Sequence, residues 1–196
     1  MSEDRMRSLE DQVAELQAEL AAKADEMAIY GEELAFYDGA VAAVAGMSGY
    51  RRGEDPLASP EDVLAAIREA CTAESVAILR RASGEFRVIT SLPQTGPLVE
   101  GQRVESTWLY RLCYDENGGR RRGARACENT ADSAPELAEL GVERLMAIPY
   151  TYLGEVRVLA LCNRWFPAST AGGRTTQWYL TPEARFLEIV VSLFPL

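Results

Sequence analysis

Apolar residues recur along the first quarter of the chain at the spacing of a coiled coil. With Met6 as position a of a heptad, eleven of the twelve a and d positions carry an apolar or tyrosine side chain. A straight helix does not keep this 3.5-residue period, because its face drifts by about 20° in each heptad. The pattern therefore predicts a coiled-coil helix over residues 1–46, most simply in a parallel homodimer. The predicted seam contains Met6, Leu9, Val13, Leu16, Leu20, Lys23, Met27, Tyr30, Leu34, Tyr37, Val41 and Val44.

The polar exception in this seam is Lys23, the only lysine of the chain. A polar residue in the seam fixes the register and the number of strands, at some cost in stability. Alternatively, the long lysine stem carries the ammonium group past the seam into solvent, and then it fixes neither. Both interpretations stay open at this point. The flanking charges support a homodimer weakly, because Arg5 and Glu10 would attract across the seam while Glu33 and Asp38 would repel. A more basic partner helix is the alternative.

The pattern changes after residue 46. Residues 47–58 are polar and contain Gly and Pro, which predicts a linker before a globular domain over residues 59–196. Helices are expected after the capping residues Ser59, Ser106 and Thr181 and over residues 133–140. Strands are expected over residues 75–81, 86–91, 120–127, 144–153 and 155–164, with residues 92–105 irregular. This order of elements predicts an α+β domain.

Composition and charge narrow the function classes. The chain has 196 residues, of which 47% are hydrophobic and 26% charged, and it contains no histidine. Histidine-dependent triads and histidine-ligated metals are therefore excluded, and we predict no metal site and no cofactor. Residues 1–46 carry eleven acidic and three basic side chains out of a chain total of 30 and 20, a net charge of −8 within −10. Such a segment repels nucleic acids and anionic membranes, so neither is expected as a partner.

The ends and the cysteines indicate a location. The chain begins with charged residues where a signal peptide would be apolar, and no run of about 18 apolar residues is present. We therefore expect a cytoplasmic protein. The four cysteines form no CxxC pair, so reduced thiols are expected: Cys71, Cys113, Cys127 and Cys162.

One segment carries a family resemblance. Residues 141–150 read as a Gly-led turn and a strand with Pro149 near its end, and residues 153–164 as a Gly hairpin and a strand that ends in Asn163-Arg164. Together with Leu180-Thr-Pro-Glu before an apolar helix, this resembles a GAF domain over residues 59–196. The resemblance implies a central antiparallel sheet of five to six strands flanked by helices, with a ligand-sized pocket on the face opposite the main helices. A GAF domain led by a long coiled helix is common in signalling proteins.

A pocket is also expected from the residue types, because small-molecule sites combine apolar walls with a few convergent polar groups. The helix after Ser106, the 120–127 strand and the 141–150 segment supply aromatic, arginine and backbone groups of this kind. Plain core is the alternative for the first two of the predicted pocket residues, which are Trp108, Leu112, Cys113, Arg125, Ile148 and Tyr150.

The resemblance does not extend to two ligand sets of the family. The cyclic-nucleotide set is Asn-Lys followed by Phe-x-x-x-Asp-Glu. Here Asn163-Arg164 matches loosely, but Leu180 replaces the Phe and residues 184–185 are Ala-Arg. Bilin attachment uses a cysteine usually followed by histidine, and Cys113 is followed by tyrosine. Neither ligand is expected.

Two further candidates remain. Some stand-alone family members reduce free methionine sulfoxide with several thiols, and Cys113, Cys127 and Cys162 are the corresponding candidates, with Arg125 able to favour the thiolate of Cys127. Residues Arg120–Arg122 with Arg125 form the densest basic patch, which could bind an anion, a phosphate or an acidic helix, or could be a solvated turn.

The sequence thus predicts a non-catalytic, dimeric regulatory protein that senses a small ligand or docks a partner. No kinase, cyclase or DNA-binding segment follows the last predicted helix, so either a protein partner is expected to carry the output or the chain is a fragment of a longer signalling protein. The alternatives are a scaffold whose pocket is filled by its own side chains and a thiol-dependent reductase.

Overall fold

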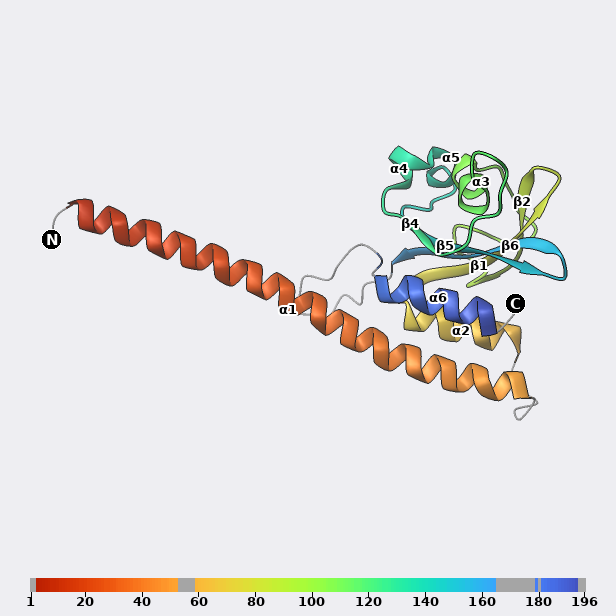
Figure 1. The fold of residues 1–196 in the computed structure, drawn as a ribbon, viewed down its shortest axis with the longest axis horizontal. Helices are drawn as coiled ribbons and strands as arrows, with labels where there is room; N and C mark the ends of the chain where they lie inside the picture. The colour runs from red at the N-terminus through yellow and green to blue at the C-terminus, as the bar shows by residue number, and fades with distance from the viewer. Residues whose placement is uncertain (1–2, 53–58, 165–178, 180, 194–196) are drawn as a thin grey trace.

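The computed structural model describes residues 3–52, 59–164, 179 and 181–193. Within the first helix, the side chains of residues 3–9, 32 and 47–52 lie outside this description. The described chain forms one long helix followed by a domain in which a six-stranded sheet lies between two layers of helices (Figure 1). The helices on one side are the long ones, and those on the other side are short.

Every neighbouring pair of strands in the sheet is antiparallel. Their spatial order is β3-β2-β1-β6-β5-β4. The four longer strands form two hairpins that pair with each other through β1 and β6, so the centre of the sheet is made of residues far apart in the sequence. The strands are β1 (Ala73–Ala82), β2 (Glu85–Leu92), β3 (Arg103–Val104), β4 (Arg125–Cys127), β5 (Leu145–Tyr152) and β6 (Glu155–Arg164).

Both predicted hairpins are confirmed. Their turns are Ser83-Gly84, with φ of 49° and 97°, and Leu153-Gly154, with φ of 49° and 83°. Two successive residues with positive φ match the right-handed twist of the flanking strands. Leu153 adopts this conformation although it has a side chain, and that side chain is exposed.

The expected strand over residues 120–127 is mostly wrong, since only its last three residues form β4. Gly123 lies between them and the basic residues with φ of 96°, which a strand cannot accommodate. Arg120 makes only an isolated bridge to Tyr114. The segment expected to be irregular contains the two-residue strand β3.

Two helices, α2 (Pro60–Ala70) and α6 (Thr181–Leu193), cover one face of the sheet, and the second half of α1 (Glu3–Arg52) packs on their outer side (Figure 1). The predicted cap of α2 is confirmed, because Ser59 and Asp62 form a reciprocal capping box. The cluster between these helices and the sheet includes Phe36, Leu64, Ile67, Val76, Ile78, Met146, Leu159, Phe186 and Leu187.

The opposite face is covered by α3 (Thr107–Cys113), α4 (Thr130–Ser133) and α5 (Pro135–Ala138). One helix was expected over residues 133–140. The chain breaks at Ala134 (φ −152°, ψ 61°), because a residue before proline disfavours the helical conformation. The space over this face, where the resemblance implies a pocket, holds a second apolar cluster that includes Phe86, Leu98, Leu109, Leu112, Leu137, Leu145 and Val158.

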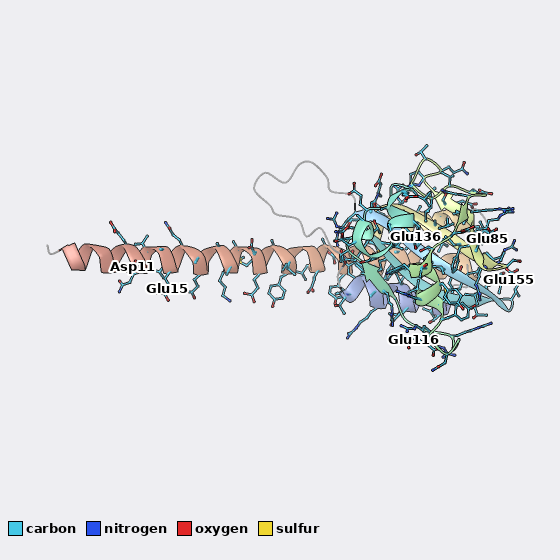
Figure 2. The ribbon with its side chains drawn as sticks, turned by 90° about the horizontal axis from the view of Figure 1, so that it is seen from above. Asp11, Glu15, Glu85, Glu116, Glu136 and Glu155 are labelled. Atoms are coloured by element: carbon cyan, nitrogen blue, oxygen red, sulfur yellow. The ribbon has the colours of Figure 1, made fainter. Side chains whose placement is uncertain are left out.

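Helix α1 runs to Arg52, six residues beyond residue 46, so part of the expected linker is helical. Its 50 residues correspond to about 75 Å at 1.5 Å per residue. The second half packs on the domain through Phe36, Ala40 and Ala43, which are buried. The first half projects away, and Figure 2 shows no other described helix or strand beside Asp11 and Glu15.

Candidate functional site

The predicted seam of α1 is exposed to solvent along its described length. The exposed fractions of its large apolar side chains range from 52% at Tyr37 to 74% at Met27. Lys23 pairs with Glu26 of the same helix at 2.7 Å. Val44 is half-buried against the domain, and the side chains of Met6 and Leu9 lie outside the described residues. The exposed seam residues are Val13, Leu16, Leu20, Met27, Tyr30, Leu34, Tyr37 and Val41.

A different stripe of α1 contacts the domain. Phe36, Ala40 and Ala43 occupy heptad positions c and g, whereas the seam occupies a and d. The ring of Phe36 meets that of Phe186 in α6 edge to face, with centroids 5.7 Å apart and an interplanar angle of 82°. The second half of α1 therefore binds its own domain and leaves the seam uncovered.

A hollow of about 730 Å³ lies along the outer part of β5, which we call the β5 hollow. Strand β4 pairs only with Leu145–Ala147, so the β5 residues beyond Ala147 have no strand on that side among the described residues. The hollow is bounded by this strand, by the end of α3, by the basic segment before β4 and by α6. Its lining residues are Cys113, Arg120, Arg121, Arg122, Gly123, Ile148, Pro149, Tyr150, Thr151, Val156, Glu188, Val191 and Ser192.

The turn that leads into the basic segment is fixed by hydrogen bonds. The Asp115 carboxylate accepts from the backbone N–H of Asn117 at 2.9 Å and of Gly119 at 2.7 Å. The Asp115 N–H donates to the Gly119 carbonyl at 2.8 Å, and the Arg121 N–H donates to the Cys113 carbonyl at 2.8 Å. Hydrogen bonds within the turn, and one to the end of α3, thus fix the backbone just before and within the basic segment. Glu116, in the same turn, lies on the outside of the domain (Figure 2).

The far end of the basic segment is held by strand β5 and helix α6. The Arg120 guanidinium donates to the Thr151 hydroxyl at 3.1 Å. The Ala124 N–H donates to the Glu188 carboxylate at 3.3 Å. A Cβ on Gly123 would lie 3.2 Å from the same carboxylate, which would have to shift slightly, and the positive φ of Gly123 is the stronger reason for glycine here.

The structure separates the six predicted pocket residues. Cys113, Ile148 and Tyr150 line the β5 hollow. Trp108 and Leu112 pack in the second apolar cluster, and Arg125 is exposed on β4. Burial raises the pKa of the Tyr150 phenol, so this side chain is a neutral hydroxyl at physiological pH.

The sequence interpretation missed the wall contributed by α6, which consists of Glu188, Val191 and Ser192. The available signal was the pair of polar residues Glu188 and Ser192, spaced one turn apart in the otherwise apolar stretch 186–193 of α6. The same interpretation named the basic residues 120–122 as a patch but did not place them beside the pocket.

The three candidate redox thiols are buried, and the strand register places two of them too far apart to form a disulfide. Cys127 and Cys162 each pair with Leu145 from opposite sides, so they lie two strands, about 9–10 Å, apart. A disulfide needs Cα atoms within about 7 Å. Burial raises the pKa of Cys113 and of Cys162 to about 12, and it also raises the pKa of Cys127. None of the three has the lowered pKa of a reactive thiol.

The Asn163-Arg164 pair, which forms part of the family resemblance, makes contacts that hold neighbouring segments of the domain together. The Asn163 amide accepts from the backbone N–H of Glu143 at 2.7 Å and donates to the Gly141 carbonyl at 3.1 Å, which fixes the Gly-led turn. Arg164 forms an ion pair with Glu183 in the first turn of α6 at 3.2 Å. An acidic partner for Arg164 is therefore present, one position before the Ala-Arg that replaces the family's acidic pair.

Two further features are absent from the described residues. Among them, no helix is both long and apolar enough to cross a membrane. The same residues contain no group of three or more acidic, cysteine or histidine side chains arranged to bind a metal ion.

No family model and no curated protein sequence matches the chain. Solved structures with a similar fold exist. The phycoerythrobilin-bound GAF domain from a cyanobacterial phytochrome is 14% identical, with a TM-score of 0.50 over 77% of this chain and 89% of that one. The GAF domain of a phosphoenolpyruvate-protein phosphotransferase from Coxiella burnetii is 14% identical, with a TM-score of 0.49 over 82% and 90%. At this identity, the likeness to the phytochrome domain shows the fold: the described chain has the GAF-like α+β architecture that the sequence pattern predicts.

Proposed function

We propose that the chain is a non-catalytic regulatory module of a signalling system, dimerised through α1 and responsive to a small ligand in the β5 hollow. The exposed seam carries this proposal. Eight large apolar side chains lie uncovered in a single row at heptad spacing. Exposed apolar surface of this size marks an interaction site, and the heptad period selects another helix as its partner. A second copy of α1 offers the matching row.

The β5 hollow is connected to α1 through one helix. Val191 and Ser192 line the hollow from α6, and Phe186 on the same helix contacts Phe36 of α1. A ligand that moves α6 therefore acts directly on the helix that carries the seam. This short path supports a sensing role over a purely structural one.

The cysteines support a non-catalytic role. A thiol-dependent reductase needs a thiolate at neutral pH, and burial holds Cys113, Cys127 and Cys162 in the protonated form. We place the protein in the cytoplasm, with a protein partner that carries its output. The four free cysteines support that location.

One observation favours a second candidate function, a scaffold that binds no ligand. The sheet face where the resemblance implies a pocket is filled by Phe86, Leu109 and Leu112, all about 1% exposed. A scaffold would use α1 for assembly and leave the β5 hollow to solvent. A thermal-shift screen of small organic molecules separates the two functions, because a bound ligand raises the melting temperature.

The dimer is tested with two variants of the full chain, both measured by light scattering at micromolar concentration. In Leu16→Glu/Leu20→Glu, four carboxylates would face one another across the seam. This variant is expected to run as a monomer of 21.6 kDa, whereas the parent runs as two chains. Ala14→Glu/Ala18→Glu adds the same charge at two exposed positions off the seam and is expected to remain dimeric. A monomeric parent would overturn the proposal.

A further inference from the structure

The β5 hollow concentrates positive charge in an acidic protein. Three of its lining side chains are guanidinium groups, from Arg120, Arg121 and Arg122, and Glu188 is the one carboxylate among its described lining residues. The chain as a whole carries a net charge of −10. A local excess of positive charge in such a protein attracts an anion to this point of the surface.

The two outer guanidinium groups are not engaged elsewhere in the described structure. The Arg120 side chain donates to Thr151, but the side chains of Arg121 and Arg122 have no hydrogen bond or ion pair to any residue that the structure describes. Other arginines of the domain differ, since Arg80 pairs with Glu155 and Arg164 with Glu183. Two guanidinium groups therefore remain available beside the hollow.

The backbone that presents these groups is already ordered. The Arg121 N–H is bonded to the Cys113 carbonyl, and the Ala124 N–H to the Glu188 carboxylate. Binding through such a segment loses less conformational entropy than binding through a free loop. The guanidinium fork suits the two oxygens of a carboxylate or phosphate, with which it forms paired, charge-assisted hydrogen bonds.

The other walls indicate an organic body on the ligand. Ile148, Pro149, Val156 and Val191 contribute apolar surface, and the volume of about 730 Å³ is within the range of small-molecule sites. An inorganic ion would leave this surface in contact with water. The carboxylate of Glu188 would repel a second negative charge on the part of the ligand near α6.

From this combination we propose that the β5 hollow binds a small organic oxyanion, whose carboxylate or phosphate is held by Arg121 and Arg122 and whose apolar part contacts Ile148 and Val191. The inference rests on the proposed function, since it names the class of ligand that is sensed. It assigns the basic patch a binding role and leaves Arg120 as the residue that fixes the segment to β5.

The test uses isothermal titration of the full chain with three probes: benzoate, phenyl phosphate and the neutral isostere benzamide. Benzoate or phenyl phosphate is expected to bind, and benzamide is expected to bind about tenfold or more weakly, as expected for the loss of a charge-assisted hydrogen bond. The Arg121→Gln/Arg122→Gln variant is expected to weaken oxyanion binding by a similar factor. Arg87→Gln, which removes an exposed arginine from β2 near the other edge of the sheet, is the matched control and is expected to bind like the parent.

The outcomes separate this inference from the proposed function. Benzamide binding as tightly as benzoate, with both lost in Ser192→Trp, overturns the oxyanion class but leaves a ligand site in the β5 hollow. Oxyanion binding that persists in the double arginine variant overturns the assignment of Arg121 and Arg122. If none of the probes binds, the inference is overturned, while the seam variants still decide the dimer. Because Arg122 is exposed and the half-buried Arg121 side chain has no polar partner among the described residues, unchanged circular dichroism is expected for their variant.

Discussion

The ion pair between Arg164 and Glu183 gives the sharpest test of the energetics. Its atoms are 3.2 Å apart, and the side chains are only 7% and 1% exposed. It joins the last residue of β6 to the first turn of α6. Replacing Glu183 with Leu leaves the Arg164 charge buried without this partner. Removing one partner of such a pair costs about 3–5 kcal/mol in the free energy of unfolding.

This loss is large beside the total stability of a domain, about 5–15 kcal/mol. For a chain of this size, about 1 kcal/mol corresponds to about 2–4 °C. The melting temperature of Glu183→Leu is therefore expected to fall by about 6–20 °C. Urea unfolding followed by circular dichroism, at one fixed protein concentration because a dimer gains stability with concentration, measures the same loss as free energy.

The coupling between the Arg164 and Glu183 substitutions has a predicted sign. In Arg164→Met/Glu183→Leu both charges are gone, and apolar side chains of similar volume fill the space, so the double variant is expected to be far more stable than the sum of the two single losses allows. Arg185→Leu, an exposed change on the same helix, is expected to shift stability by less than about 0.5 kcal/mol. A Glu183→Leu variant within about 1 kcal/mol of the parent, or additive single losses, would refute the argument.

Four other results are expected. Leu153→Asn is expected to stabilise the domain by about 0.5–1 kcal/mol in urea unfolding, because asparagine tolerates the positive φ at this exposed turn and leucine does not. Alkylation of Cys113 by iodoacetamide in the folded protein is expected to be about 1,000-fold slower than that of a thiol with pKa 9.0, and its rate is expected to rise with pH up to about 12. Fast labelling at pH 7 would instead support the thiol-dependent reductase. Since the pKa of this thiol and that of Cys162 are raised on folding, stability is expected to be intact below pH 9 and to fall above it, which alkaline urea titrations measure. Phe36→Leu is expected to cost about 1 kcal/mol through the lost ring contact with Phe186, and the loss should vanish in a Phe186→Leu background.

The sequence was sufficient where the determinants are local. The hairpin turns depend on Gly84 and Gly154, which supply one of the two positive φ angles, and the start of α2 depends on the Ser59–Asp62 capping box. Each of these involves residues within four positions of one another. The apolar strands beside the turns then follow from their length and composition.

The candidate site depends on residues far apart in the chain, and here the sequence was insufficient. Glu188 of α6 reaches the backbone of Ala124, 64 positions away, and Arg164 finds its partner in the next element. No local pattern encodes such contacts. Conversely, Trp108 and Leu112 are residue types that suit a pocket wall, yet here they pack in the core. Only the packed fold decides between a pocket wall and the core.

The two stripes of α1 fix how a pair of domains would be arranged. The same rigid helix carries the contacts to its own domain and, a third of a turn away, the row that would face a second copy. Domains in a pair would therefore flank a shared central rod, and their angular placement around it would be set by helical phase. Seven residues inserted into the projecting half would lengthen the rod and preserve that angle, whereas three or four would turn everything ahead of the insertion around the axis.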